Sequence, residues 1–225
     1  MSLHQLLLMT WFSPGYPVGA FAYSHGLEWA QEAGDIRDAP TLLAWLTDLV
    51  EHGAARNDAI LSAASWRAAV ADDWSGVAGI AELGLAMAAS TERRMETVTQ
   101  GNAFVLASRA AWPCSALDRM KDEIPGDIPL AVAVGVTAAG HGVPLPSLLA
   151  GCIHGFAANL VSASVRLGVV GQTDGQRVLA GLMPAIGHLA EFAEGATLDD
   201  LGACTFRSDI ASLAHETQYS RLFRS

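Results

Sequence analysis

Histidine, cysteine and acidic side chains are the groups in this chain that could bind a metal ion. The best-spaced pair is His25 and Glu28, which lie three residues apart and so on one face of a helix. Cys152 and His154 lie two residues apart, where helical side chains point to different sides. Imidazole and thiolate suit nickel and zinc, but neither pair completes a three- or four-ligand site, so we assign no metal ligand. A site shared across a dimer axis stays open, because symmetry doubles every ligand.

Acid–base catalysis has equally little support in the sequence. The paired acids Asp72-Asp73 and Asp199-Asp200 fall in expected turns, where carboxylates are normally solvated. The chain has no GxSxG, HExxH, GxxxxGK[ST] or GxGxxG motif of the kind that marks nucleophilic, zinc or nucleotide chemistry. We therefore assign no catalytic residue and predict that the protein is not an enzyme. The alternative is a metal-dependent or acid–base enzyme housed in a helical bundle.

The composition argues against two classes of protein. Acidic residues outnumber basic ones by 23 to 13, which gives a formal net charge of -10, whereas a nucleic-acid-binding protein needs a basic face. Residues 145–167 are apolar and numerous enough to cross a bilayer, but they include His154, Asn159 and Arg166, which are costly to place in lipid. We therefore expect no nucleic-acid partner and no membrane span.

The cysteines indicate a reducing compartment. Cys114, Cys152 and Cys204 are odd in number, lie far apart and form no CxxC pair, so a disulfide framework is not expected. Residues 1–9 contain no positively charged region of the kind that begins a signal peptide. These features predict a cytoplasmic protein with free thiols.

Apolar residues recur at helical spacing along most of the chain, and no stretch alternates in the manner of a strand. We expect an all-α fold, a single-domain helical bundle of about ten helices that covers residues 1–225. Residues 129–139 and 145–167 are apolar nearly all round, which places both stretches in the middle of the bundle. The other expected helices cover residues 3–11, 38–53, 57–70, 74–88, 91–111 and 172–192, with a final helix that begins at Ser208.

Charged residues carry three further expectations. Residues 118–127 are highly charged and contain Pro125-Gly126, which predicts a loop. Arg166 ends the longest apolar helix, so its charge must be partnered internally or exposed at an interface. A surface ion network is expected near the start of helix 91–111, formed by Glu92, Arg93, Arg94 and Glu96.

Residues 18–28 place small residues among aromatic ones. Gly19, Ala20, Ala22 and Gly26 leave room for another backbone to approach closely. We expect this segment to pack tightly against another helix rather than to take part in catalysis.

The C-terminal residues are unusually apolar for a chain end. Ser208 suits a helix start, and the positions that should then form one apolar face are Ile210, Leu213, Ala214 and Thr217. Aromatic and arginine side chains follow, a composition typical of a binding hot spot. We expect residues from about 205 to 225 to dock on a surface, and that surface belongs either to the same domain or to a partner.

Four ordered motifs resemble the F-type urease accessory proteins, the UreF family. The most specific is the C-terminal run from His215 to Ser225, HETQYSRLFRS. The others are PVGAF with the following Ser24 and Gly26-Leu27-Glu28, then TERR with Gln100-Gly101, and NLVSASVRL followed by GQTD. The chain departs from the family pattern at Tyr23, where members often carry a histidine, and this weakens a metal role at that position.

The resemblance implies an all-helical, homodimeric, cytoplasmic chaperone that takes part in nickel insertion. Such proteins bridge the D/H-type scaffold and the G-type GTPase, so that nickel reaches the urease apoprotein with coupled GTP hydrolysis. Nickel transits the complex, and no cofactor is expected to be stably bound. By resemblance, the C-terminal segment docks on the D/H-type protein through His215, Glu216, Gln218, Tyr219, Arg221, Leu222, Phe223 and Arg224. The N-terminal motif would form the dimer surface or recruit the GTPase through Phe21, Tyr23, Ser24, His25 and Glu28.

Overall fold

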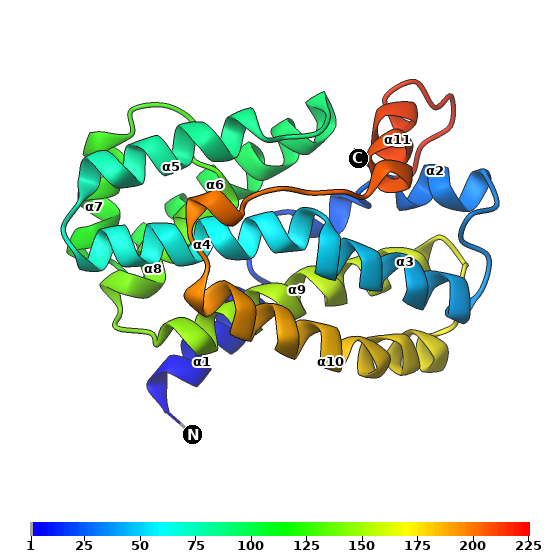
Figure 1. Ribbon diagram of the computed structural model, residues 1–225, viewed down its shortest axis with the longest axis horizontal. Helices are drawn as coiled ribbons and strands as arrows, with labels where there is room; N and C mark the ends of the chain where they lie inside the picture. The colour runs from blue at the N-terminus through cyan, green and yellow to red at the C-terminus, as the bar shows by residue number, and fades with distance from the viewer. Residues whose placement is uncertain (1) are drawn as a thin grey trace.

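Residues 2–225 are described by a computed structural model, and every regular element in them is helical (Figure 1). No strand occurs in this part of the chain, which confirms the all-α prediction. The elements are α1 (Leu3–Trp11), η1 (Ala20–Ala22), α2 (Leu27–Glu32), α3 (Ala39–His52), α4 (Ala54–Val70), α5 (Trp74–Ala86), α6 (Thr91–Ala111), α7 (Ser115–Glu123), α8 (Leu130–Gly140), α9 (Leu145–Arg166), α10 (Gln172–Gly195), η2 (Leu198–Asp200) and α11 (Phe206–His215).

Helices begin where the sequence supplies a side chain that can satisfy a free backbone N–H. Asp38 accepts from the backbone N–H of Thr41 at 2.9 Å at the start of α3. Ser90 accepts from the backbone N–H of Arg93 at 3.1 Å at the start of α6. Each such contact stabilises a helix start by about 1 kcal/mol. The second contact also fixes the position of the first turn of α6, which carries several charged side chains.

The short helix α8 lies in the middle of the bundle, as its composition predicts. Val132 and Val136 are completely buried, and α4, α6, α7 and α9 lie around the helix. The approach to α4 is close at Gly135, because a Cβ there would lie 2.5 Å from the Ser62 carbonyl oxygen. Glycine at this position therefore permits the contact between the two helices.

The long helix α9 is the second core helix. It is the one helix within residues 2–225 that is long and apolar enough to cross a membrane, and here it packs against α10, α4 and α3. Gly151 and Gly155 form a notch for the Phe12 ring, since a Cβ on either glycine would lie 3.0–3.2 Å from ring atoms. Less than half of the apolar stretch of α9, 44%, is buried by this packing.

The loop prediction for residues 118–127 is wrong for residues 118–123, which are helical, whereas residues 124–127, with Pro125-Gly126, lie outside any helix as predicted. Helix α7 runs through Glu123 and buries Leu117, Met120 and, just beyond its end, Ile124. These residues recur at helical spacing, and α7 packs against α8 and α5. The charged residues of this stretch lie on the outer face of the helix, where high charge is compatible with helical structure.

After α10 the chain crosses the molecule and brings its C-terminal end beside α2 (Figure 1). The crossing segment is held near the junction of α3 and α4. There the backbone N–H of Cys204 donates to the His52 carbonyl oxygen at 2.8 Å, and the backbone N–H of Gly202 donates to Asn57 Oδ1 at 3.0 Å. Three distant parts of the sequence, residues 22–32, 90–100 and 205–225, thereby come together.

Candidate functional site

Residues 205–225, here called the C-terminal segment, begin with α11. Thr205 rather than Ser208 precedes the helix, and the predicted apolar face points outward: Phe206, Ile210 and Leu213 are 72%, 62% and 51% exposed. The buried side consists of Ser208, Ala211, Ser212 and His215. Ile210 and Leu213 thus lie on one face of the helix, as their spacing predicts, but that face does not pack against this domain.

Close packing against α2 explains why the small and polar side of α11 is the buried one. Gly26 has a φ of 76° at the start of α2, and a Cβ there would lie 2.8 Å from the Ser212 backbone nitrogen. The backbone of Ala211 and Ser212 meets Gly26 directly, so a large side chain at either position would prevent the approach. The tight helix contact predicted for residues 18–28 is thus confirmed.

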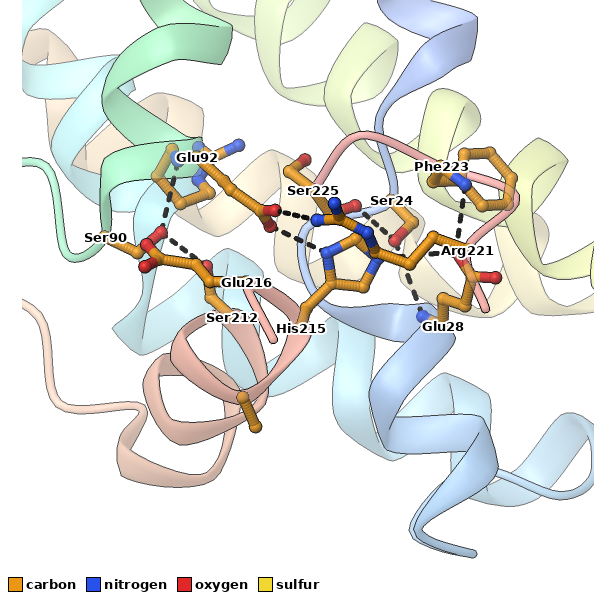
Figure 2. A network of polar contacts seen from close by, with 12 residues as sticks. Ser24, Glu28, Ser90, Glu92, Ser212, His215, Glu216, Arg221, Phe223 and Ser225 are labelled. Atoms are coloured by element: carbon orange, nitrogen blue, oxygen red, sulfur yellow. Dashed lines mark hydrogen bonds and ion pairs between the residues drawn. The ribbon is translucent and has the colours of Figure 1, made fainter. Parts of the chain in front are cut away.

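His215 lies completely buried between two carboxylates (Figure 2). Its Nδ1 is 2.7 Å from Oε2 of Glu92, and its Nε2 is 3.3 Å from Oε2 of Glu28. A carboxylate oxygen only accepts hydrogen bonds, so both contacts are satisfied together when both ring nitrogens carry a proton. Arg221 donates to the other oxygen of Glu92 at 2.7 Å. Two acids, one imidazole and one guanidinium therefore form a compact charge cluster.

Glu28 also holds the backbone of the last residues. Its two oxygens accept from the backbone N–H groups of Leu222 at 2.7 Å and Phe223 at 2.9 Å (Figure 2). Arg224 donates its backbone N–H to the Ala22 carbonyl oxygen at 2.8 Å. The chain end is fixed through its main chain, and this leaves several side chains free to point outward.

Phe223 and Ser225 complete the attachment of the C-terminal segment. The guanidinium of Arg166 lies 4.5 Å from the centre of the Phe223 ring and donates to the Phe21 carbonyl oxygen. The Ser225 carbonyl oxygen accepts from both the backbone and the hydroxyl of Ser24. Of the two alternatives for Arg166, partnering within the chain is the one observed.

The predicted surface ion network at the start of α6 is in part a buried one. Glu92 and Glu96 are 7% and 3% exposed, whereas Arg94 is on the surface. Glu96 contacts Arg93, Nε2 of His25 at 2.8 Å and the Ser225 hydroxyl at 2.9 Å. Burial alone would raise the pKa of Glu96, but Arg93 and His25 outweigh it and lower the pKa to about 2.

His25 and Glu28 do not form the metal pair that their spacing permitted. His25 precedes α2 with a φ of 56° and contacts α6, whereas Glu28 contacts the C-terminal segment. Burial and the neighbouring Arg93 lower the pKa of His25, which favours its neutral form. Within residues 2–225 no three His, Cys, Asp or Glu side chains come together as metal ligands.

The predicted site residues divide into buried and exposed sets. Tyr23, Ser24, His25 and Glu28 of the N-terminal motif are buried, and Phe21 is 68% exposed. In the C-terminal segment His215, Gln218 and Phe223 are buried, whereas Tyr219 and Leu222 are 106% and 65% exposed and Arg221 and Arg224 lie at the surface. Glu216 is partly buried and accepts from the backbone N–H of Thr91 at 2.8 Å.

Sequence reasoning missed half of this network. The missed members are Ser90, Glu92, Glu96, Ser212 and Ser225, which supply most of the contacts on the α6 side. No single stretch of sequence indicates that these residues belong to the network, because their partners lie more than a hundred residues away. The one available signal was the pair of acids at the start of α6, whose burial the sequence pattern does not indicate.

Comparisons with known proteins give a consistent result. The UreF family model matches residues 36–183. The urease accessory protein UreF of Methylobacterium radiotolerans is 52% identical over 224 residues, which cover 100% of this chain and 98% of that protein. The urease accessory protein UreF of Rhodopseudomonas palustris strain BisB5 is 51% identical over 218 residues, which cover 97% of this chain and 90% of that protein.

Proposed function

Because the chain belongs to the UreF family of urease accessory proteins, we propose that it acts in urease maturation as an adaptor and not as an enzyme. In this proposal it bridges the D/H-type scaffold protein and the G-type GTPase in the cytoplasm, as a homodimer. The bridged complex delivers nickel to the urease apoprotein, and GTP hydrolysis is coupled to delivery. The nickel ion is cargo of the complex rather than a resident cofactor of this chain.

The observation that carries the proposal is the exposed apolar surface of the C-terminal segment. Phe206, Ile210 and Leu213 recur at i, i+4 and i+7 and form one outward stripe, here called the α11 stripe. Tyr219 and Leu222 add two further exposed large apolar side chains. Exposed apolar and aromatic groups of this kind favour protein–protein association. We assign the α11 stripe and the side chains of Tyr219 and Leu222 to docking on the D/H-type protein.

The buried contacts behind this surface support a binding role for the segment. Glu28, Glu92 and His215 hold the segment in place, so its exposed side chains are already positioned before a partner arrives. A preorganised surface loses less conformational entropy when it binds. The acid–base groups of Glu28, Glu92 and His215 are engaged with one another and with the backbone. This favours a structural role for these residues over a catalytic one.

The N-terminal motif has a second, mostly indirect role in this proposal. Phe21 is exposed and can contact the GTPase or a second copy of the chain directly. Tyr23, Ser24, His25 and Glu28 are buried, and Ser24 and Glu28 hold the last residues of the chain. Changes in these two residues would therefore alter both proposed binding surfaces at once.

The test is co-purification of the chain with its cognate D/H-type protein and GTPase. Ile210→Asp together with Leu213→Asp places charge on the α11 stripe without touching the buried side of the helix. We expect this variant to keep its helical circular dichroism spectrum and melting temperature and to lose the D/H-type protein. Leu106→Asp is the matched control, because Leu106 on α6 is 74% exposed. If the folded double variant assembles like the unchanged chain, the proposed docking surface is wrong.

A further inference from the structure

Two neighbouring cavities lie between the helices of the bundle, and the C-terminal segment lines part of the smaller one. The larger has a volume of about 350 Å³ and lies between the residues that follow α1 and helices α4, α6, α8 and α9. The smaller, of about 90 Å³, lies on the side of α5 and α11. Both are lined by the same four polar residues, which separate them: His25, Asp58, Arg93 and Thr97.

Asp58 on α4 is the unusual member of this polar wall. Within residues 2–225 its carboxyl group makes no hydrogen bond and no ion pair, and the residue is partly buried and lines both cavities. Desolvation by the surrounding protein raises the pKa of Asp58 to about 6. A partly buried carboxylate without a partner is destabilising unless a ligand supplies the missing donor or charge. Asp58 is thus an acceptor in the cavity wall that nothing in the described chain satisfies.

The charged neighbours of Asp58 do not neutralise it. Arg93 donates to Glu96 and also lies 2.7 Å from Nε2 of His25, so its charge is used by the Glu96 carboxylate. The two carboxylates, Asp58 and Glu96, face a single guanidinium, that of Arg93. The negative charge of Asp58 is therefore not compensated. On the α9 side Asp58 faces Cys152, whose pKa is raised by burial and by Asp58 itself. No cation on this wall is therefore free to pair with Asp58.

His25 adds a second polar atom without a partner to the same wall. Its Nε2 lies 2.8 Å from Oε1 of Glu96, which only accepts, and 2.7 Å from Nη1 of Arg93, which only donates. Its Nδ1 is buried and has no hydrogen-bond partner. The polar wall therefore holds two groups, the Asp58 carboxyl group and His25 Nδ1, that the described chain leaves without a partner.

The remaining walls of the larger cavity are mainly apolar. They include Trp11, Phe12, Phe104, Leu130, Val134 and Phe156, with polar side chains such as Gln100, Asn159 and Ser162 between them. A volume of about 350 Å³ with apolar walls and a few polar groups is typical of a site for a small organic molecule. A metal ion fits less well, because no three ligating side chains come together within residues 2–225.

We propose that the larger cavity binds a small organic cation, a primary ammonium or amidinium group carried on an apolar ring or short chain, with Asp58 as its counter-ion. The cationic group supplies the charge and the hydrogen-bond donors that Asp58 lacks, and the apolar body lies against the aromatic side chains. This site is separate from the docking surface of the C-terminal segment and does not depend on the proposed adaptor function.

The direct test measures binding of matched cationic and neutral probes to the full chain. Benzylamine and benzamidine are compared with benzyl alcohol and benzamide by calorimetry and ligand-observed NMR at pH 7.5. We expect saturable binding of the two cations, mutual competition between them, and at least ten-fold weaker binding of the neutral probes. Equal binding of the neutral probes, or no saturable binding of any cation, would overturn the proposal.

Variants assign the binding to Asp58. Asp58→Asn removes the charge with little change in shape and should weaken benzylamine at least ten-fold, whereas Asp58→Glu should keep part of the affinity. Asp48→Asn, at an exposed acid on α3, is the matched control and should bind as the unchanged chain does. Unaltered affinity in a folded Asp58→Asn variant would contradict the assignment. If nickel alone displaced benzylamine from the unchanged chain, and Asp58→Asn abolished this effect of nickel, the site would be a metal site instead.

The pH dependence gives an independent readout. The groups around Asp58 are Glu96, His25 and Cys152, with Asp209 near Arg93 on the smaller cavity. Glu96 stays ionised because its pKa is about 2, and burial raises the pKa of Cys152 far above neutrality. We therefore expect benzylamine affinity to fall about ten-fold from pH 7.5 to pH 5, as Asp58 takes up a proton near pH 6. Constant affinity over this range would overturn the role of Asp58.

Discussion

Oε2 of Glu28, at the start of α2, accepts a hydrogen bond from the backbone N–H of Phe223 at 2.9 Å, across 195 residues of sequence. Oε1 of the same side chain accepts from the backbone N–H of Leu222. One buried carboxylate therefore fixes the direction of the last residues of the chain. Its removal is the sharpest way to separate attachment of the C-terminal segment from the rest of the fold.

Glu28→Ala should destabilise the protein by about 2–4 kcal/mol, because two buried N–H groups and His215 lose an acceptor. Urea unfolding measures the loss, and trypsin should cut more rapidly at Arg221 and Arg224. Glu82→Ala, at an exposed position on α5, is the control and should change stability by less than about 0.5 kcal/mol. Unchanged trypsin cleavage in Glu28→Ala would show that other contacts suffice to hold the segment.

His215→Ala should cost about 3–5 kcal/mol, the usual result of removing one partner from a buried charged cluster. The carboxylates of Glu28 and Glu92 would then face a cavity with only Arg221 to balance them. Urea unfolding measures the loss. His52→Ala, at an exposed histidine at the end of α3, is the control and should change stability by less than about 0.5 kcal/mol. A loss as small as that of the control would show that the buried cluster contributes little to stability.

Arg166→Lys should cost about 1 kcal/mol, because lysine keeps the charge but loses the planar stacking on Phe223 and the contact to the Phe21 carbonyl oxygen. Thermal unfolding measures the loss. The control is Arg177→Lys, since Arg177 on α10 is exposed and pairs with Asp174 at the surface. Equal small effects in the two variants would mean that the stacking contributes little.

Asp58→Asn should stabilise the protein at neutral pH. The pKa of Asp58 is raised from 3.8 to about 6 in the folded state, so the unchanged chain loses stability as the pH rises from about 4 through 6. The variant escapes this loss and should be more stable at pH 7.5 by up to about 3 kcal/mol. Below pH 4 the two proteins should be equally stable. Urea unfolding across this range checks the sign, and a destabilised variant at pH 7.5 would show that Asp58 already has a partner.

Periodicity was sufficient to predict most helices, because most of them bury an apolar stripe. It also placed α8 in the interior, since that helix is apolar on every side and has no face that prefers water. The sequence pattern does not predict α7, because charged residues surround the two buried positions, Leu117 and Met120, that show its helical spacing.

The orientation of α11 could not be predicted from its own residues. Apolar side chains normally face the core, and here Ile210 and Leu213 face outward because the neighbouring backbone at Gly26 admits only small groups. The buried charge cluster was equally hidden, since Glu92 and His215 lie 123 residues apart. Sequence alone indicated that the C-terminal residues dock somewhere, and the pairing of buried acids with His215 and Arg221 required the tertiary structure.

The attachment of the last residues through main-chain atoms has a consequence for how this surface can change. Glu28 and Ser24 contact the backbone of residues 222–225, and a backbone N–H is present whichever side chain the residue carries, proline excepted. Substitutions at Tyr219 and Leu222 can therefore alter what the surface recognises while its position on the protein stays the same. The C-terminal segment is for this reason a suitable place to redesign partner selectivity, by varying a few outward side chains on a fixed backbone.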